Sequence, residues 1–528
     1  MLLIIIVILL KTIMIKSTIK SMNPKTNCKC GSYFVKSHSH LNRMRDPGAH
    51  SFPYALRLAP RASRLLITLI YALVFLLGAS PPLIRDVSAL SIEDERKMGE
   101  EFMGQALAHF QFVKDPFANQ FINGLGHYLI TPLETKNFPF NFYIIKDNTL
   151  NAFAVPGGHI FVFSGLIEAM DNIDELAAVL CHEIGHISAR HLAKRIDQSK
   201  SIGLATLAGI LAGILLGGEV AGAMITGSLA AGMQAKLHYS REDERQADQL
   251  SYKYMVPTGF DPAGMVCALD KIQKGSWLGA GTGKVPAYLL THPTGPERMS
   301  NLEALLTGYM PRPLSKEAAL LKSRFPAFKT VITASCLDPR DAERLFNREL
   351  EENPDAPLPH FGLGMVYMEE GRYDEAIREL EKSLHGKPGF IPILRALGEA
   401  YQMNDQGEKA LTVLKKVLEL NHRDVAALYL LGITYESLGK DSKALRLFER
   451  LSYLKPVRID VYYHLGLCYG REGKLALAHY NFGRYFRRLG QARKAQFHFQ
   501  KAKGLAGNNP VLQKKIIREM EGLGQRNA

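Results

Sequence analysis

Cysteine is scarce in this chain: its 528 residues include six cysteines, and no two of them are spaced as CxxC. The missing spacing excludes a zinc ribbon and a thioredoxin-type redox motif. Cys28 and Cys30 lie near the start of the chain, and the other four lie far apart. The sequence does not fix the pairing of those four, which are Cys181, Cys267, Cys336 and Cys468.

The sequence also lacks a stripe of arginine and lysine interleaved with aromatic residues, so nucleic acid is not an expected partner. The net charge is +14, yet residues 1–80 hold eleven basic residues and one acidic residue, whereas the remainder holds 54 and 50. The basic excess is therefore mostly an N-terminal feature. With 47% hydrophobic and 22% charged residues the composition is globular, and the length predicts two or three domains.

Two apolar stretches, Leu2–Leu10 and Leu65–Ala79, lie in the first 80 residues. The second follows Arg57, Arg61 and Arg64 and precedes small residues and two prolines, which is typical of a secretory signal. It is shorter than the roughly 20 residues that a bilayer-spanning helix needs. The alternative is an uncleaved membrane anchor. No cysteine directly follows the stretch, so a lipoprotein anchor is not indicated.

A secretory signal is unusual this far into a chain. Met44 offers a simple explanation, because a chain that starts there would have Met44–Arg64 as the basic part of the signal. We therefore interpret residues 1–43 as a mis-called start or an N-terminal extension. Residues 44–80 are predicted to be a signal peptide or an N-terminal membrane anchor.

Four columns of residues recur every 34 positions in the last third of the chain. Glycine occupies the first column, tyrosine the second, alanine the third, and leucine or phenylalanine the fourth. The members are Gly364, Gly398, Gly432 and Gly466; Tyr367, Tyr401, Tyr435 and Tyr469; Ala376, Ala410, Ala444 and Ala478; and Leu380, Leu414, Phe448 and Phe482. Small residues let two helices cross closely, and the large ones fill the space between neighbouring units.

This periodicity resembles the tetratricopeptide repeat over residues 357–490, which implies an α-solenoid of four repeats that binds partners. The same spacing continues upstream at Ala342 and Phe346, so we expect a connector and a half-repeat over residues 311–356. Residues 491–528 are predicted to be capping helices.

The resemblance also implies which residues line the concave side of the array, because the fifth position of each first helix usually does so. These positions hold three aromatic residues and one cation, which suits apolar or extended polypeptide segments. Alternatively, the side chains pack between the helices. The four residues are Phe361, Arg395, Tyr429 and Tyr463.

Residues 174–195 are rich in helix-forming residues, with Asp174 as a candidate N-cap, and they contain an HExxH sequence. His182 and His186 are four positions apart, so both imidazoles would point from one helix face toward one ion. Glu183 lies beside them and could take a proton from a water on that ion. The sequence therefore predicts one catalytic zinc ion per chain.

The third zinc ligand does not come from the extended HExxHxxGxxH pattern, because Ala189 and Leu192 replace its glycine and histidine. At about 100° per residue, His191 would lie on the face of the helix opposite His182, so it is predicted to be a surface or packing histidine. Further along the chain, Glu244 and Asp248 are i and i+4 and share a face. Glu244 could bind the metal while Asp248 accepts a hydrogen bond from a ligating imidazole.

The HEIGH sequence, followed by SREDERQAD at Ser240–Asp248, resembles the M48 family of zinc metallopeptidases. The resemblance implies that His182, His186 and Glu244 are zinc ligands and that Glu183 is the general base. It also implies a gluzincin-type peptidase domain over residues 81–310, with helices and a small β-sheet. A strand beside the active site would bind the substrate, and the segment that matches it is Asn151, Ala152, Phe153, Ala154 and Val155.

A loop containing His292 and Pro293, with Arg298 after them, matches the family's HP-x4-R sequence. By resemblance, His292 could occupy the fourth position on the zinc and hold the enzyme shut. The alternative role for His292 is to cap the loop. Arg298 is a candidate for stabilising the oxyanion that forms during peptide hydrolysis.

Residues 201–235 are rich in glycine, alanine, leucine and isoleucine and carry one charge, Glu219. We expect a buried helical hairpin beside the active site. The alternative is a surface that touches a membrane or unfolded barrel proteins, and residues 65–79 are a second candidate for membrane association.

Taken together, the sequence predicts a mainly α chain in which a zinc peptidase domain precedes an α-solenoid. The combination resembles the BepA-type periplasmic proteases of Gram-negative bacteria. That resemblance implies a zinc endopeptidase that acts on misfolded or stalled outer-membrane β-barrel proteins, with repeats that bind clients or the assembly machinery. It implies a periplasmic location, or an inner-membrane anchor facing the periplasm. The alternative function is mainly that of a chaperone or assembly scaffold whose protease is usually shut.

Overall fold

The computed structural model describes residues 90–198, 239–278, 286–455 and 457–524. The predicted signal or anchor and the glycine-rich segment 201–235 lie outside the described residues. Within the described ranges, none of the helices combines the length and the apolar character needed to cross a membrane.

A small sheet forms the centre of the peptidase part. Its strands are β1 (Asn141–Ile145), β2 (Ala152–Val155) and β3 (His159–Phe163), in the order β1-β3-β2. β3 pairs with β1 in parallel and with β2 antiparallel. The β2–β3 turn needs Gly158, which has φ +90°, and a Cβ there would lie 2.5 Å from the Pro139 carbonyl oxygen.

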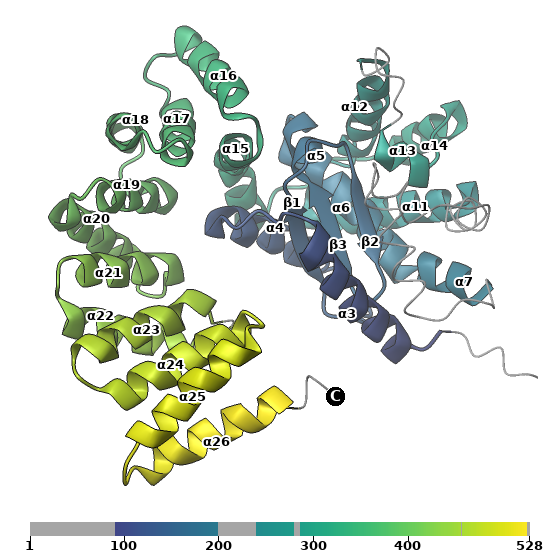
Figure 1. Cartoon of the computed structure of the whole chain (residues 1–528). Coiled ribbons are helices and arrows are strands. Elements are labelled where there is room, and N and C mark those ends of the chain that lie inside the picture. The colour runs from purple at the N-terminus through teal and green to yellow at the C-terminus, as the bar shows by residue number, and fades with distance from the viewer. Residues whose placement is uncertain (1–89, 199–238, 279–285, 456, 525–528) are drawn as a thin grey trace, which may run out of the picture. The chain divides into compact units, whose positions relative to one another are not determined.

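Helices cover both faces of this sheet, and β3 shows why, because its side chains alternate between the faces. Phe161 and Phe163 pack with Met98 and Phe102 of α3 (Ile92–His109). Ile160 packs in the larger core on the other face, which also contains side chains of the helices α4 (Pro116–Leu129) and α6 (Ile173–Ser188). In Figure 1, the ribbons of α3 and α6 lie beside the strands. The remaining helices of this part are α5 (Ser164–Ala169), α7 (His191–Gln198), α11 (Arg241–Thr258), α12 (Gly264–Leu278), α13 (Ala287–Thr291) and α14 (Pro296–Leu306).

The HExxH sequence lies in α6, which is buried at every position from Ile173 to Ile187. A helix that is buried all round lies inside a core, and α6 packs against α11 and α12 and beside β2. The N-cap is Asn172, whose side chain accepts a hydrogen bond from the Glu175 backbone N–H. The expectation that Asp174 caps this helix was wrong, because the helix begins one residue earlier, at Ile173, and Asp174 is in its first turn.

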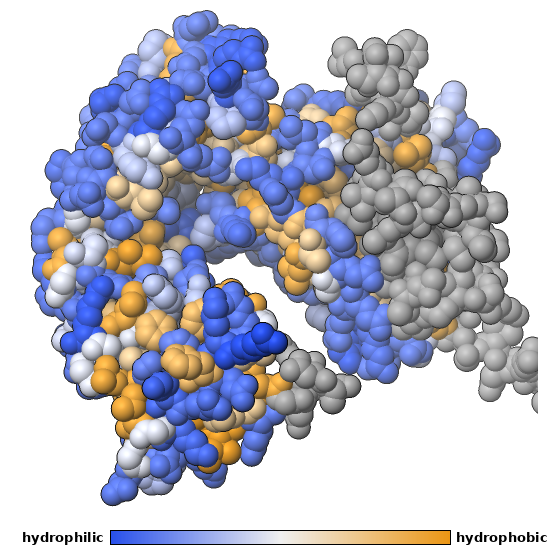
Figure 2. Space-filling view, viewed as in Figure 1, coloured by the Kyte–Doolittle hydropathy of each residue, from blue (hydrophilic) through white to orange (hydrophobic). Residues whose placement is uncertain are grey.

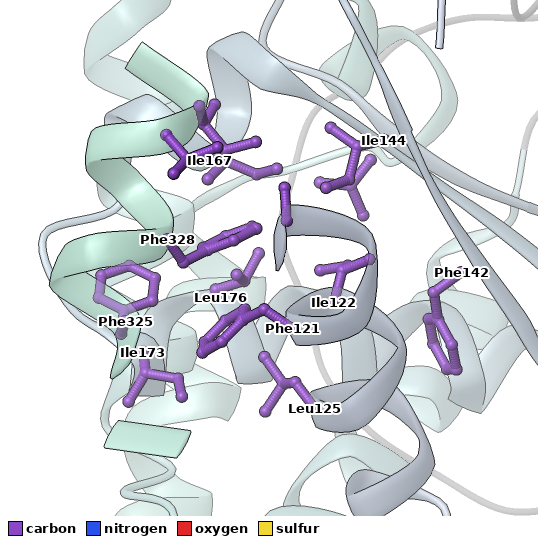
Figure 3. Close-up of a cluster of buried hydrophobic side chains, with 14 of the residues drawn as sticks. Phe121, Ile122, Leu125, Phe142, Ile144, Ile167, Ile173, Leu176, Phe325 and Phe328 are labelled. Carbon is purple, nitrogen blue, oxygen red and sulfur yellow. The ribbon is translucent and has the colours of Figure 1, made fainter. Parts of the chain in front are cut away.

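The long helix α15 (Lys316–Cys336) follows the peptidase part and packs against α4, α5 and α6. Figure 3 shows Phe325 and Phe328 of α15 among buried side chains that include Phe121 of α4 and Leu176 of α6. The rings of Phe121 and Phe328 are stacked, with centroids 4.3 Å apart. The same helix also packs against α17, so it lies within one continuous core with the first repeat.

The repeats are successive pairs of antiparallel helices, as the 34-residue period predicted. A Cβ added to Gly398 would lie 2.6 Å from Leu414 of the second helix in the same unit, so the glycine column lets the two helices meet.

The predicted fold class, a mainly α chain with a peptidase domain before an α-solenoid, is confirmed. The helices are α16 (Pro339–Glu352), α17 (Pro357–Glu369), α18 (Tyr373–Gly386), α19 (Ile391–Met403), α20 (Gly407–Leu420), α21 (Val425–Ser437), α22 (Asp441–Tyr453), α23 (Ile459–Arg471), α24 (Leu475–Arg488), α25 (Ala492–Leu505) and α26 (Pro510–Gly524).

The four predicted groove residues differ in how accessible they are. Phe361 and Tyr429 are 2% and 7% exposed and pack inside the array, which is the alternative that the sequence left open. The Arg395 guanidinium lies 3.8 Å from the Asp424 carboxylate. Tyr463 is 40% exposed and is therefore the residue of this set that presents an aromatic surface.

Candidate metal centre

Four buried side chains converge in the peptidase part: His182, His186, Glu244 and His292. Each offers one nitrogen or oxygen atom, and these four atoms all lie within 4.8 Å of one another. His182 and His186 come from α6, Glu244 from α11, and His292 from the residue after α13. The three predicted ligands therefore meet at one point, and the predicted fourth ligand meets them there.

The close approach of α6 and α11 brings Glu244 to the two histidines. A Cβ on Gly185 would lie 3.0 Å from the Ala247 carbonyl oxygen, so the glycine between the histidines lets the α11 backbone approach. Ser240 and Asp243 form a capping box that fixes the start of α11 at Arg241, three residues before Glu244. In this arrangement Nε2 of His186 is 3.0 Å from Nε2 of His182 and 3.3 Å from Oε1 of Glu244.

The donor atoms fit a zinc ion. Two imidazoles and a carboxylate are the ligands of a common class of catalytic zinc site, which leaves a fourth position open. Within the described part of the chain, both carboxylate oxygens of Glu183 and Nε2 of His292 are buried without a hydrogen-bond partner. Buried polar atoms without partners are costly, and a cation with its water would satisfy them.

The electrostatics of the two histidines differ. Burial holds the pKa of His186 well below its usual value, so this imidazole is neutral, which is the form that binds a metal. Burial acts to lower the pKa of His182 too, but hydrogen bonds to Asp248 and Glu244 overcome it and raise that pKa to about 9. Burial also raises the pKa of Glu183, and the charges of His292 and His182 oppose that shift.

Asp248 and Arg298 support the ligands from one side. Asp248 Oδ1 lies 2.9 Å from Nδ1 of His182, in the position expected for a carboxylate that orients a ligating imidazole. Arg298 donates from Nε and Nη2 to the two oxygens of Asp248, at 2.9 and 2.8 Å. Its Nη1 lies 2.5 Å from Glu244 Oε2, so the guanidinium is held by two carboxylates of α11.

His292 lies between two carboxylates of the cluster. Its Nδ1 is 3.0 Å from Glu244 Oε1, and its Nε2 is 3.5 Å from Glu183 Oε1. The ring is fully buried and stacks on Tyr288, with centroids 4.4 Å apart. The structure therefore places the His292 side chain beside the three predicted ligands. Its backbone also caps α13, because the His292 N–H donates to the Tyr288 carbonyl oxygen at 2.8 Å, so both roles that the sequence left open fit the structure.

His191 is a packing residue, one of the two alternatives predicted for it, but its predicted place on the far face of the helix was wrong. The predicted continuous helix stops at Ser188, and Arg190 adopts a left-handed conformation with φ +56° before α7 begins. Because the helix ends before His191, the angle of 100° per residue does not describe its position. His191 is 1% exposed. Its Nδ1 lies 3.0 Å from Nδ1 of His186, and its Nε2 lies 2.9 Å from Oε1 of Gln246.

The break after α6 is stabilised by a residue far away in sequence. Arg190 donates from Nε to Oε1 of Glu95 at 2.7 Å and also bonds the carbonyl oxygen of Leu90. Glu95 is 2% exposed and belongs to α3. No local signal in the sequence marks this turn, because the usual glycine at such a position is absent.

The predicted substrate segment coincides with β2, an edge strand of the sheet that packs beside α6. Asn151, just before β2, is 3% exposed, and its side-chain oxygen is buried without a partner among the described atoms. A cavity of about 610 Å³ is lined by residues of α11, α14 and the loop between His292 and α14, including Glu244, Asp248 and Arg298.

Comparison with known proteins shows which families this chain resembles. Residues 118–306 match the model of peptidase family M48, and residues 337–389, 367–424 and 427–456 match models of the tetratricopeptide repeat. This chain carries an M48 peptidase domain followed by tetratricopeptide repeats. Both predicted resemblances are confirmed, and the M48 match covers α6, α11 and the His292 loop.

Several curated relatives are named as proteases, and one of those described below is named as a metalloendopeptidase. The "Beta-barrel assembly-enhancing protease" of Yersinia pestis is 30% identical over 308 residues, which cover 58% of this chain and 62% of the relative. The protein of the same name from Escherichia coli is 29% identical, with coverage of 57% and 62%. The "Mitochondrial metalloendopeptidase OMA1" of Schizosaccharomyces pombe is 25% identical, with coverage of 42% and 64%. The matched regions thus span about three fifths of the length of these relatives.

Proposed function

We propose that this chain is a zinc-dependent endopeptidase. The observation that carries the proposal is the convergence of His182, His186 and Glu244, with the buried carboxylate of Glu183 beside them. Zinc held there would supply a Lewis acid that polarises a peptide carbonyl and acidifies water.

The residues of the chain have separate tasks in this reaction. Glu183 takes a proton from the attacking water, because both oxygens of its carboxylate are buried beside the ligands without a hydrogen-bond partner among the described atoms. Asp248 orients His182, and Arg298 holds Asp248 and Glu244 in place. The edge strand β2 is suited to bind an extended substrate through its backbone, which gives weak sequence selectivity. With Arg298 held by two carboxylates, its proposed contact with the oxyanion requires a shift of the guanidinium.

We further propose that the substrates are misfolded or stalled outer-membrane β-barrel proteins and that the repeats bind clients or their assembly machinery. The support is the name of the relatives from Yersinia pestis and Escherichia coli together with the repeat array. The location that suits this role is the periplasm, reached through the signal in residues 44–80, or the periplasmic face of the inner membrane if those residues are an anchor.

His292 is proposed to be the latch of the resting enzyme. Its ring lies within reach of the same point as the three ligands, and a neutral imidazole is a good zinc ligand. A fourth protein ligand would take the position that water needs, so substrate cleavage requires the loop after α13 to move.

The Glu183→Gln variant tests the proposed chemistry. Because Glu183 is not a ligand, the variant should bind zinc as the parent does yet lose casein cleavage by at least about 100-fold. If the variant cleaves casein at the parental rate, Glu183 is not the base. If the variant is inactive but still rescues a strain that lacks the gene, the scaffold function carries the biology.

A further inference from the structure

The first inference concerns the side of His186 that faces away from the proposed zinc, and it rests on the proposed function. Nε2 of His186 points into the ligand cluster, 3.3 Å from Glu244 Oε1. When Nε2 binds a metal, the proton of a neutral imidazole must be on Nδ1. That Nδ1 lies 3.0 Å from Nδ1 of His191.

We propose that His191 and Gln246 position His186 through a directed chain of hydrogen bonds. If His186 Nδ1–H donates, then Nδ1 of His191 must accept and the His191 proton must be on Nε2. Oε1 of Gln246 lies 2.9 Å from this Nε2, where it can accept the hydrogen bond. Asp243 Oδ1, 3.8 Å from the same nitrogen, places negative charge where the proton is required. Both N–H donors in this series of hydrogen bonds, His186 Nδ1 and His191 Nε2, then have an acceptor.

The two metal-binding histidines are therefore held in different ways. His182 contacts the carboxylate of Asp248, whereas His186 contacts a neutral imidazole. Glu183 and Glu244 are already buried beside the ligands, and a further carboxylate on His186 would add negative charge to the same enclosed space. A neutral partner fixes the ring orientation without that charge. His191 is thus a positioning residue, and the turn at Arg190 precedes the helix that carries it to His186.

Zinc affinity, measured by competition with a chromogenic chelator, tests this chain of hydrogen bonds. The His191→Phe variant keeps a ring but cannot accept a hydrogen bond, so its affinity should fall by about 10- to 100-fold. Gln246→Leu should weaken binding in the same direction, and Gln246→Glu, which still accepts, should restore it to within about threefold. His109→Phe, at the exposed end of α3, is the matched control and should bind zinc like the parent.

The zinc affinities of the parent and the variants test the zinc site and the positioning role separately. If the parent protein binds no zinc, the proposed function fails and the positioning role falls with it. If the parent binds zinc but His191→Phe and Gln246→Leu bind it equally well, the zinc site stands and the positioning role is overturned. Equal loss in Gln246→Leu and Gln246→Glu would also contradict it, because only one of them lacks the acceptor.

The second inference concerns the C-terminal end of the repeat array and does not depend on the metal centre. The helices α24, α25 and α26 span Leu475–Gly524, which contains ten basic residues and two acidic ones. One of the two, Glu519, is ion-paired with Arg487 at 2.5 Å. The chain beyond residue 80 is otherwise nearly balanced in charge, so this is a local concentration that the N-terminal excess conceals.

The cations share their helix faces with exposed apolar side chains. On α26, Val511, Lys514, Lys515 and Arg518 have the i, i+3, i+4 and i+7 spacing of one face, and all four are exposed. On α25, Phe497 is 52% exposed, and Lys501 Nζ lies 5.9 Å from the centre of its ring. Figure 2 shows the same mixture, with orange side chains scattered among blue ones at the C-terminal end of the array.

We propose that these three helices, Leu475–Gly524, form a basic cap that binds the surface of an anionic lipid bilayer. Lysine and arginine are attracted to anionic headgroups, and large apolar side chains among them can enter the boundary between headgroups and acyl chains. Polar residues would suffice for a cap that only keeps the array soluble, yet Phe497, Val511 and Ile517 are each more than 40% exposed. An acidic protein segment would be served by the cations without these apolar residues.

A tryptophan placed in the cap reports binding there and ignores any membrane contact of the N-terminus. The full chain has one tryptophan, so Phe497→Trp in a Trp277→Phe background gives a local signal. Vesicles of phosphatidylcholine with 30% phosphatidylglycerol should shift its emission to the blue, and brominated lipid should quench it. Pure phosphatidylcholine or high salt should abolish both effects.

Two pairs of adjacent exposed lysines provide a matched comparison. Reversing the charge of Lys514 and Lys515 to Glu should weaken vesicle binding by at least about tenfold, whereas the same change at Lys415 and Lys416 of α20 should not. Equal binding by both variants, or equal binding to neutral and anionic vesicles, would overturn the inference. A signal with polyglutamate but not with anionic vesicles would overturn it in favour of an acidic protein partner.

Discussion

At the scale of single residues, Glu168 of α5 is notable because burial leaves its Oε1 atom without a hydrogen-bond partner among the described atoms. Burial raises the pKa of its carboxyl group to about 7, and the charge of Lys329 only partly opposes this. The folded chain therefore holds this proton more tightly than the unfolded chain does. The free energy of unfolding should fall as the pH rises from about 4.5 to about 7.

The Glu168→Gln substitution removes the free-energy cost of ionising this buried carboxyl group. Because the side chain is partly exposed, we expect a gain in the free energy of unfolding of about 1–2 kcal/mol at pH 8 and almost none at pH 4. Urea denaturation of both proteins at the two pH values measures it. A gain of equal size at both pH values would show that the carboxyl group does not titrate as described.

His292 is the residue whose substitution distinguishes a latch from a catalytic group. The ring lies 3.0 Å from Glu244 Oε1 and is fully buried, so His292→Ala should open a position for water at the zinc. We expect basal casein hydrolysis to rise, by about tenfold or more, while His422→Ala, an exposed histidine in the repeats, leaves it unchanged. A lower or unchanged basal rate in His292→Ala would remove the latch.

At the scale of elements, the contact between α6 and α11 depends on Gly185. A Cβ there would lie 3.0 Å from the Ala247 carbonyl oxygen and 3.2 Å from its Cα, and backbone atoms cannot turn aside as a flexible side chain can. The Gly185→Ala variant should lose about 1–3 kcal/mol of stability and bind zinc more weakly, because α11 carries Glu244.

The control for Gly185 is another glycine inside a helix. A Cβ added to Gly104 of α3 would meet no atom within 4 Å, so Gly104→Ala should stabilise the chain by about 0.5–1 kcal/mol through helix propensity alone. Thermal unfolding and chelator competition on both variants provide the measurement. If Gly185→Ala behaves like Gly104→Ala, the close approach of α11 is not essential.

The elements also show what the sequence could and could not predict. The repeat helices were predictable because a 34-residue period places every glycine opposite a large residue in the same unit, as Gly398 and Leu414 show. The end of α6 was not, because its left-handed residue is Arg190 and its partner Glu95 lies in α3. A turn that is stabilised by a distant contact leaves no local signal, and the position of His191 was missed with it.

At the scale of the whole molecule, some site residues were predicted from their spacing and others from a family resemblance. The spacing of the histidine pair predicts that both lie on one helix face, and the i, i+4 pair of Glu244 and Asp248 made Glu244 a candidate ligand. The role of His292 came only from the resemblance to the M48 family. The contact of α6 with α11 brings His182, His186 and Glu244 to one point, and His292 reaches the same point from the residue after α13. The groove residues Phe361 and Tyr429 were less predictable, because spacing in a repeat gives a register position but not the burial that neighbouring units impose.

The central claim is that one zinc ion is held by His182, His186 and Glu244. Anomalous diffraction at the zinc absorption edge, from crystals of the full chain purified without chelator, tests it most directly. We expect one anomalous peak per chain, within bonding distance of those three side chains and of His292 when the latch is closed. A fully ordered cluster with no peak after zinc is added, or a peak bound by other residues, would contradict it.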